Sequence, residues 1–165
     1  MNIFENIPYF LFLVSLLLLY LYKKPVYLII FVVGTIMDKI LNTILKGWIQ
    51  EPRPTEDKKK FAMEKLYGFA VDWDRYGMPS AHAQNLFFST VFLSCVLKNK
   101  WITLLYLVLS LLCLYNRVYS QKKHSLIQVI VGSIIGSLVA IFFYHYGMKS
   151  IPKKWKMKQD DDAPI

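Results

Sequence analysis

The chain has 165 residues, of which 55% are hydrophobic and 16% aromatic, and its formal net charge is +9. This length suits one domain and excludes two of ordinary size. The excess of lysine and arginine is compatible with nucleic-acid binding, but a basic rim against anionic lipid headgroups explains it equally well in so apolar a chain. We therefore expect membrane lipids, and no nucleic acid, as partners.

Five apolar runs predict an all-α membrane bundle of about five transmembrane helices. Each run is close to the ~20 residues that cross the hydrocarbon core of a bilayer, and Tyr and Trp gather at the ends of the runs, as interfacial anchors do. The first run has no basic segment before it and no small-residue cleavage site after it, so we expect a retained helix and no signal peptide. The expected spans are 3–22, 25–46, 79–98, 100–119 and 125–146.

The expected domain covers residues 1–150 and is followed by a flexible charged tail over 151–165. Five spans put successive connections on alternating sides of the membrane, so the long loop 47–78 and the short connection 120–124 lie on one side. The unusual polar residues all belong to that side. Both cysteines lie inside apolar runs, and we interpret them as packing residues that form neither a disulfide nor a metal site.

The first polar motif closes the second span. Lys46 ends this helix, and Asn42 and Asp38 lie on the same helical face, one and two turns earlier. The prolines on either side of Arg53 stop the helix and hold the arginine extended. Lys46 and Arg53 can therefore converge on one anion, although two snorkelling cations at the membrane interface are the more ordinary interpretation of this motif alone.

The second motif is the stretch "YGMPSAHAQ", where the polar loop gives way to the third span. Pro79 suits the first turn of a helix, and the amides of Ser80, Ala81 and His82 would then point outward beside the serine hydroxyl. A helix N-terminus of this kind is a ready anion site. His82 can reach the same anion. The alternative is a simple helix cap followed by a surface histidine.

The third motif, "NRVYSQKKHSLIQ", joins the last two spans. Arg117 lies near the end of the fourth span, where a charge is costly and usually marks a function. His124 opens the fifth span, and Gln128 lies one turn later, where its amide can hold the imidazole. Ser125 and Gln128 also fit an S-x-x-Q capping box, in which Gln128 serves the helix end instead.

Taken together, the three motifs bring three cations, a serine-bearing helix N-terminus and two histidines to one membrane face. Cations and free amides suit a phosphoryl oxyanion, while one histidine can act as nucleophile and the other as acid. No carboxylate cluster and no Cys/His spacing indicates a metal. The sequence therefore predicts a phosphoryl-transfer site that uses no metal and no cofactor.

The order of these motifs, K-x6-RP, PS-x-H and R…H-x3-Q, resembles the type-2 phosphatidic acid phosphatase superfamily. More narrowly, "IQEPRP", "YGMPSAHAQ", "NRVY" and the glutamine after the last histidine are similar to the dolichyldiphosphatases, the polyprenyl-diphosphate phosphatases of N-glycosylation. The resemblance covers roughly residues 38–136. It implies a membrane phosphatase of the endoplasmic reticulum that converts dolichyl diphosphate to the monophosphate and inorganic phosphate through a phosphohistidine.

The resemblance also implies a division of labour among the motif residues. His124 would attack phosphorus, and His82 would protonate the leaving oxygen. Gln128 occupies the place at which most of the superfamily has an Asp that orients the nucleophile, and dolichyldiphosphatases are similar to this chain in having Gln there. The residues that would bind the phosphoryl group are Lys46, Arg53, Ser80, Ala81 and Arg117.

Two residues and one spacing differ from the superfamily pattern. Asn116 stands where Ser is usual before the arginine, and Ala81 stands where Gly or Ser is usual. The step from Arg117 to His124 is seven residues instead of six. Either the connection absorbs the extra residue, or the nucleophile is displaced from the phosphate.

Two alternatives to a diphosphatase stay open from the sequence. One is a catalytically silent relative that binds or transports a phospholipid. The other is a phosphatase of a different lipid or sugar phosphate, such as a lysophosphatidate or glucose-6-phosphate type. Phosphate release by the purified protein, compared with a His124→Ala control, separates the silent relative from the enzymes.

Two further expectations concern the loops. Basic residues close to the spans are more numerous on the side of the tail than on the side of the motifs, so the positive-inside rule favours a cytosolic tail and a lumenal site. In the long loop, apolar side chains are mixed with lysines, and we expect part of it to lie on the membrane surface as a lid. The apolar residues concerned are Phe61, Leu66, Phe69 and Trp73.

Overall fold

The computed structural model describes residues 6–67 and 75–150, and every regular element within these two ranges is helical. One pair of residues, Pro52 and Tyr76, forms an isolated antiparallel bridge. The helices are α1 (Ile7–Leu21), α2 (Pro25–Ile49), α3 (Lys58–Leu66), α4 (Ala81–Leu97), α5 (Lys100–Tyr115), the π-helix η3 (Asn116–Ser120) and α6 (Leu126–Ser150).

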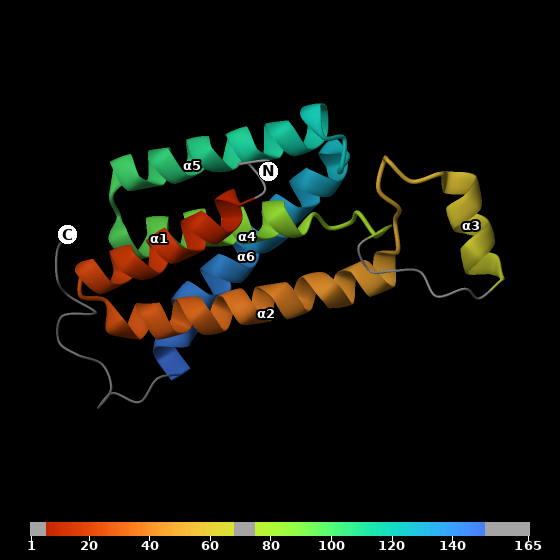
Figure 1. The fold of residues 1–165 in the computed structure, drawn as a ribbon. Coiled ribbons are helices and arrows are strands. Elements are labelled where there is room, and N and C mark those ends of the chain that lie inside the picture. The colour runs from red at the N-terminus through yellow and green to blue at the C-terminus, as the bar shows by residue number, and fades with distance from the viewer. Residues whose placement is uncertain (1–5, 68–74, 151–165) are drawn as a thin grey trace.

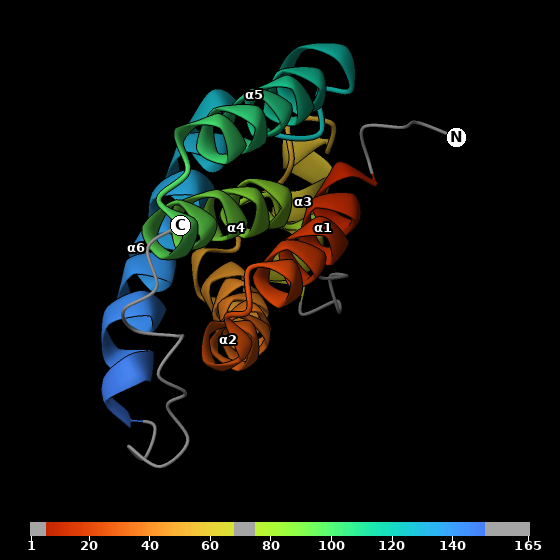
Figure 2. The ribbon, with the colours of Figure 1, turned by 90° about the vertical axis from the view of Figure 1, so that its left-hand side faces the viewer.

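Helix α4 lies at the centre of the bundle and contacts α1, α2, α5 and α6. Figures 1 and 2 show the other four apolar helices around it, with α5 and η3 running toward the start of α6. Helix α3 stands apart from the bundle, beyond the end of α2 (Figure 1). The polar loop is thus carried at one end of an apolar bundle.

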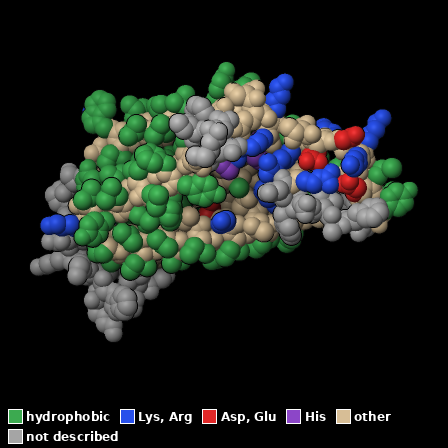
Figure 3. All heavy atoms as spheres, in the orientation of Figure 1, with side chains coloured by type: hydrophobic (Ala, Val, Ile, Leu, Met, Phe, Trp, Pro, Cys, Tyr) green, Lys and Arg blue, Asp and Glu red, His purple; other side chains and the backbone are tan. Residues whose placement is uncertain are grey.

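The chain is an all-α membrane protein, as predicted. Three helices are long and apolar enough to cross a bilayer, namely Pro25–Ile49, Lys100–Ser120 and Leu126–Gly147, whereas α1 and α4 are apolar but shorter. Hydrophobic side chains cover most of the visible bundle surface, and charged side chains gather at the loop end (Figure 3). The predicted flexible tail lies outside the described residues.

The predicted helix borders agree with the observed ones to within four residues where the structure describes them. The third span differs in a way that matters for the site. Ser80, in extended conformation, is the N-cap residue, and α4 begins at Ala81, so Pro79 precedes the helix instead of opening its first turn. Cys95 and Cys113 are free thiols, as predicted.

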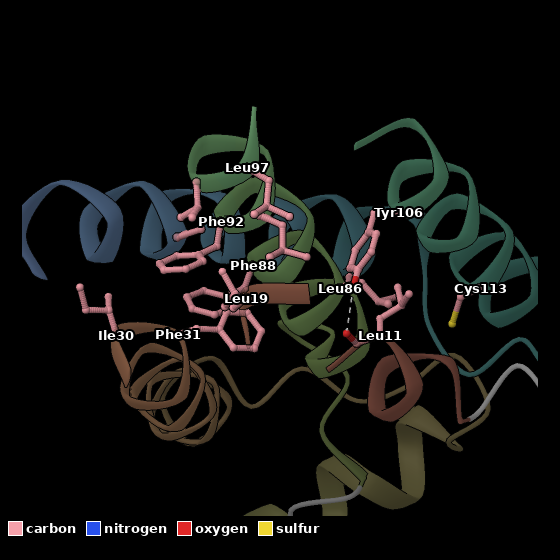
Figure 4. Close-up of a cluster of buried hydrophobic side chains, with 14 of the residues drawn as sticks. Leu11, Leu19, Ile30, Phe31, Leu86, Phe88, Phe92, Leu97, Tyr106 and Cys113 are labelled. Atoms are coloured by element: carbon pink, nitrogen blue, oxygen red, sulfur yellow. Dashed lines mark hydrogen bonds between the residues drawn. The ribbon is translucent and has the colours of Figure 1, made fainter. Parts of the chain in front are cut away.

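Aromatic packing and hydroxyl hydrogen bonds hold the core together. The rings of Phe31, Phe88 and Phe92 lie against one another, with centroids 5.4–5.8 Å apart (Figure 4). The Tyr106 hydroxyl donates to the Leu11 carbonyl oxygen at 3.3 Å, which joins α5 to α1. Because lipid tails are as apolar as the helices, such packing and interhelical hydrogen bonds, rather than exclusion of water, stabilise the assembly.

Two glycines on α6 allow its backbone to touch that of α4. A Cβ atom on Gly136 would lie 2.0 Å from the carbonyl oxygen of Gln84, and one on Gly132 would lie 2.6 Å from that of Ser80. Small residues four apart are a common device for close helix approach in membranes. This contact places the first turn of α4 directly against the first turns of α6, where the third motif ends.

We expect Gly136→Ala to destabilise the protein by about 1–3 kcal/mol, the usual cost of overpacking. The added methyl meets backbone atoms, which cannot rotate away, so the two helices must separate. Gly147→Ala is the matched control, because its Cβ would meet only the side chain of Ile30, at 2.8 Å. The measurement is thermal unfolding in detergent, and equal melting temperatures for the two variants would contradict this account.

Candidate active site

A buried polar network joins the second span to the start of α4. The Gln84 side-chain amide donates to the carbonyl oxygen and to Oδ1 of Asp38, at 2.8 and 2.9 Å. Asn42 Nδ2 donates to Gln84 Oε1 at 2.8 Å and to the Pro79 carbonyl oxygen at 3.3 Å. Asp38, Asn42 and Lys46 are all buried on one face of α2, as their spacing predicted.

Gln84 was missed as a site residue in the sequence. It is the last letter of "YGMPSAHAQ", and the only signal for it is an amide one turn after Ser80, on a helix that is otherwise mainly apolar. Its partners come from α2, more than 40 positions away, so no local pattern could reveal them.

The two ends of the long loop are fastened to each other beside the bundle. Gly77 N donates to the Glu51 carbonyl oxygen at 2.7 Å, and Arg53 N donates to the Arg75 carbonyl oxygen at 3.1 Å. These bonds flank the Pro52–Tyr76 bridge. Arg53 therefore sits on an extended arm next to the second motif, as the flanking prolines predicted.

Part of the lid prediction is wrong. Phe61 is buried, packs edge-on against Tyr76 with ring centroids 5.8 Å apart, and lies under the Arg75 guanidinium. Arg75 also forms ion pairs with Glu56 at 2.8 Å and Glu64 at 2.5 Å. Phe61 is thus an anchor of α3 and not part of a lipid-facing surface. Leu66 is 80% exposed, and the other two residues of the prediction, Phe69 and Trp73, lie outside the described residues.

Ser80 contributes to the site differently from the prediction. Its amide donates to the Gln128 carbonyl oxygen at 3.1 Å, so it is not available to an anion. Its hydroxyl makes no capping bond and is buried without a hydrogen-bond partner among residues 6–67 and 75–150. A buried hydroxyl of this kind has capacity for a ligand, because buried polar groups are normally satisfied.

Arg117 and His82 lie in direct contact. Arg117 is buried, and its Nη2 lies 2.7 Å from the ring nitrogens of His82. Its Nη1 donates to Gln121 Oε1 at 3.1 Å. The arginine near the end of the fourth span therefore faces the first turn of α4, and the second and third motifs meet as predicted.

The long step from Arg117 to His124 coincides with a π-helix. Gln121 N donates at 2.9 Å to the carbonyl oxygen of Asn116, five residues earlier. This wider turn holds one residue more than an α-turn, and such turns are frequent at functional sites. The extra residue is thus accommodated at the end of the helix, and His124 still reaches the site.

His124 is held as a neutral imidazole with a defined tautomer. The ring is buried, and its Nδ1 lies 3.1 Å from the Gly77 carbonyl oxygen. A carbonyl oxygen can only accept, so Nδ1 carries the proton and Nε2 keeps its lone pair. Burial, together with the charges of Arg53, Arg117 and Lys46, lowers the pKa of His124 to about 3. The imidazole is therefore uncharged at neutral pH.

Gln128 performs both of the roles that the sequence left as alternatives. Its Oε1 accepts from Ser125 N at 3.2 Å while Ser125 Oγ accepts from Gln128 N at 3.3 Å, which completes the capping box. The same Oε1 lies 3.3 Å from His124 Nδ1. The side-chain Nε2 donates to Glu51 Oε1 at 2.9 Å and to the Pro52 carbonyl oxygen at 3.1 Å.

The three motifs therefore meet in one place, at the end of the bundle that bears the polar loop. Figure 3 shows histidine next to Lys and Arg, where the hydrophobic surface gives way to the charged one. Residues 27–152, which make up most of the chain, match the PAP2 superfamily. The chain belongs to this superfamily. Its members supply the comparison for the remaining features of this PAP2 protein.

Three relatives illustrate the similarity. The chain is 31% identical to a dolichyldiphosphatase of Saccharomyces cerevisiae, in an alignment that covers 70% of this chain and 50% of the relative. It is 30% identical to the Homo sapiens dolichyldiphosphatase 1, in an alignment that covers 80% of this chain and 58% of the relative. A chloroplastic lipid phosphate phosphatase epsilon 1 of Arabidopsis thaliana is 34% identical, in an alignment that covers 68% of this chain and 38% of the relative. The chain thus spans about half the length of these relatives. No solved structure matches it.

Proposed function

We propose that this PAP2 protein is a membrane phosphatase that removes the terminal phosphate of a lipid diphosphate or phosphate. The observation that carries the proposal is a neutral, Nδ1-protonated His124 surrounded by Arg53, Arg117 and Lys46. A buried imidazole with a free lone pair is a nucleophile, and a group of cations around it attracts an anionic electrophile. Phosphorus in a phosphate ester or anhydride is such an electrophile.

The reaction proceeds in two displacements. His124 Nε2 attacks phosphorus, the bond from phosphorus to the bridging oxygen breaks, and His82 gives that oxygen its proton. Water then attacks the phosphohistidine, gives a proton to His82, and leaves inorganic phosphate and a restored His124. The phosphoryl oxygens are neutralised in both steps by Lys46, Arg53 and Arg117, with the Ser80 hydroxyl as an additional donor.

Arg117 links the phosphate to the acid. Its Nη2 contacts the His82 ring in the unliganded chain, so the cation proposed to bind a phosphoryl oxygen lies beside the proposed acid. Ala81 lines the same cavity as His82. Its small side chain leaves space for the substrate at the start of α4.

His124→Asn should lower phosphate release by at least ~10³-fold, since it removes the nucleophile of the proposed reaction. His82→Asn should cost about 10²–10⁴-fold, the usual worth of a general acid, and should still form phosphoenzyme from a substrate with a good leaving group. Activity is measured on purified, detergent-solubilised protein with EDTA present. A His124→Asn variant as active as wild type would assign the protein to a different chemistry, and loss of wild-type activity in EDTA would indicate a metal.

The favoured substrate is a polyprenyl diphosphate such as dolichyl diphosphate. A cavity of about 280 Å³ opens beside His82, where the leaving group of the proposed reaction lies, and its walls come from α1, α2 and α4. Pro8, Tyr9 and Phe12 give it an apolar side suited to a hydrocarbon chain. The printed names of the yeast and human relatives point to the same substrate class.

A lysine of this cavity suits a second phosphate. Lys39 lines it from within the apolar helix α2, where a cation is costly unless it has a function. A monophosphate lipid has no group to place there, whereas the leaving group of a diphosphate is itself a phosphate.

Lys39→Gln should therefore reduce kcat/KM for a polyprenyl diphosphate about tenfold, the usual worth of a charged hydrogen bond. It should change kcat/KM for a lipid monophosphate little. Lys98→Gln, at the opposite end of α4, is the control. Equal losses on both substrates would show that Lys39 does not recognise the second phosphate, without contradicting the phosphatase activity.

We infer that the protein resides in the endoplasmic reticulum with its site facing the lumen. The support is the predominance of lysines beside the spans on the side opposite the motifs, because such residues stay cytosolic. A glycosylation acceptor fused after Ile165 should stay unmodified, while one inserted in the loop after Thr55 should be modified. The reverse pattern would overturn this orientation.

A further inference from the structure

We propose that Glu51 is a positioning residue of the site, which fixes the Gln128 amide and, through it, places a negative charge behind the imidazole of His124. This inference rests on the proposed function, because it concerns the same nucleophile. Glu51 lies in the loop just after α2, 77 positions before Gln128, to which its Oε1 is bonded at 2.9 Å. It has no part in phosphate binding.

The hydrogen bonds around Gln128 allow only one orientation of its amide. On one side, Nε2 faces two acceptors, Glu51 Oε1 and the Pro52 carbonyl oxygen. On the other side, Oε1 faces two N–H donors, the Ser125 amide and His124 Nδ1. In a flipped amide, Oε1 would face the two acceptors, Glu51 Oε1 and the Pro52 carbonyl oxygen, and Nε2 would face the two N–H donors. The carboxylate of Glu51 therefore helps to ensure that an oxygen, and not an NH₂ group, meets the imidazole.

The backbone of Glu51 holds the same imidazole by a second route. Its carbonyl oxygen accepts from Gly77 N at 2.7 Å, and the Gly77 carbonyl oxygen in turn accepts from His124 Nδ1 at 3.1 Å. A Cβ atom on Gly77 would lie 2.5 Å from Gln128 Oε1, so the close packing requires glycine here. Glu51 thus reaches both groups that accept the Nδ1 proton.

The charge of Glu51 matters because the charged side chains that act directly on His124 are all positive. Arg53, Arg117 and Lys46 all disfavour a cationic imidazole. When Nε2 bonds to phosphorus, the ring acquires positive charge, and a carboxylate joined to Nδ1 through a polarised amide offsets it. The phosphate neutralises the cations on the Nε2 side of the ring, and Glu51 acts on the Nδ1 side.

Glu51→Gln removes the charge and keeps the size of the side chain. It should lower kcat by about 10- to 100-fold with a much smaller change in KM, while thermal stability stays close to wild type. Glu56→Gln, which removes a carboxylate of the same loop, is the matched control. Full kcat in Glu51→Gln, alongside an inactive His124→Asn, would overturn the positioning role and leave the phosphatase activity intact.

An exchange of the two side chains gives a second test. Gln128→Glu alone puts two carboxylates in contact and should be nearly inactive. The double variant Glu51→Gln/Gln128→Glu restores one charge and one amide, with the carboxylate now directly on Nδ1, and should recover kcat at least tenfold over Gln128→Glu. No recovery would show that the charge has no role in the reaction.

A third measurement does not depend on activity. In ¹⁵N-histidine NMR, His124 should be a neutral Nδ1–H tautomer in wild type at pH 7, with its signal assigned by the His124→Asn variant. Glu51→Ala removes one of the two acceptors of Gln128 Nε2, together with the negative charge, and should shift or broaden that signal, whereas Glu56→Ala should not. An unchanged signal in Glu51→Ala would overturn the proposal even if the protein released no phosphate from any substrate.

Discussion

The backbone contact between α4 and α6 at Gly132 and Gly136 is the constraint on which the site depends. In a lipid environment, apolar side chains gain little by leaving the solvent, so helices associate through close packing and hydrogen bonds. Here the packing is close enough for Ser80 N to donate to the Gln128 carbonyl oxygen. That bond joins the second and third motifs, and the loop motif then completes the site by hydrogen bonds to Gln128.

Charge balance explains why the cations lie close to His124, whereas the carboxylates bind other side chains around the site. The cations near His124 repel one another and are stabilised by an anionic ligand, so an anion gains most by binding among them. A carboxylate placed among these cations would compete with that ligand for them. Glu51 instead binds the far side of the Gln128 amide, and Asp38 is held by Gln84 within α2 and α4. The carboxylates thus bind side chains around the site and leave the proposed phosphate position free.

Sequence patterns predicted the helices and the motif residues because both are local. Apolar runs give the spans, and prolines mark some of their ends, to within four residues. The contacts of Gln84, the bond from Gln128 to Glu51 and the burial of Phe61 were not predictable in this way. Each depends on a partner from a distant part of the chain or on a loop packing against itself. A lone polar residue in an apolar helix is at most a hint of such a contact.

The π-helix at Asn116–Ser120 shows how the site tolerates a change in spacing. Arg117 lies in η3, directly after α5, and faces His82, whereas His124 lies two residues before the start of α6 and faces Gly77. The two residues are therefore positioned by different helices, and the segment between them needs only to be long enough. An added residue widens one helical turn locally instead of rotating either side chain away from the phosphate. Spacing within a motif is thus a weaker constraint than the tertiary contacts that each of its residues makes.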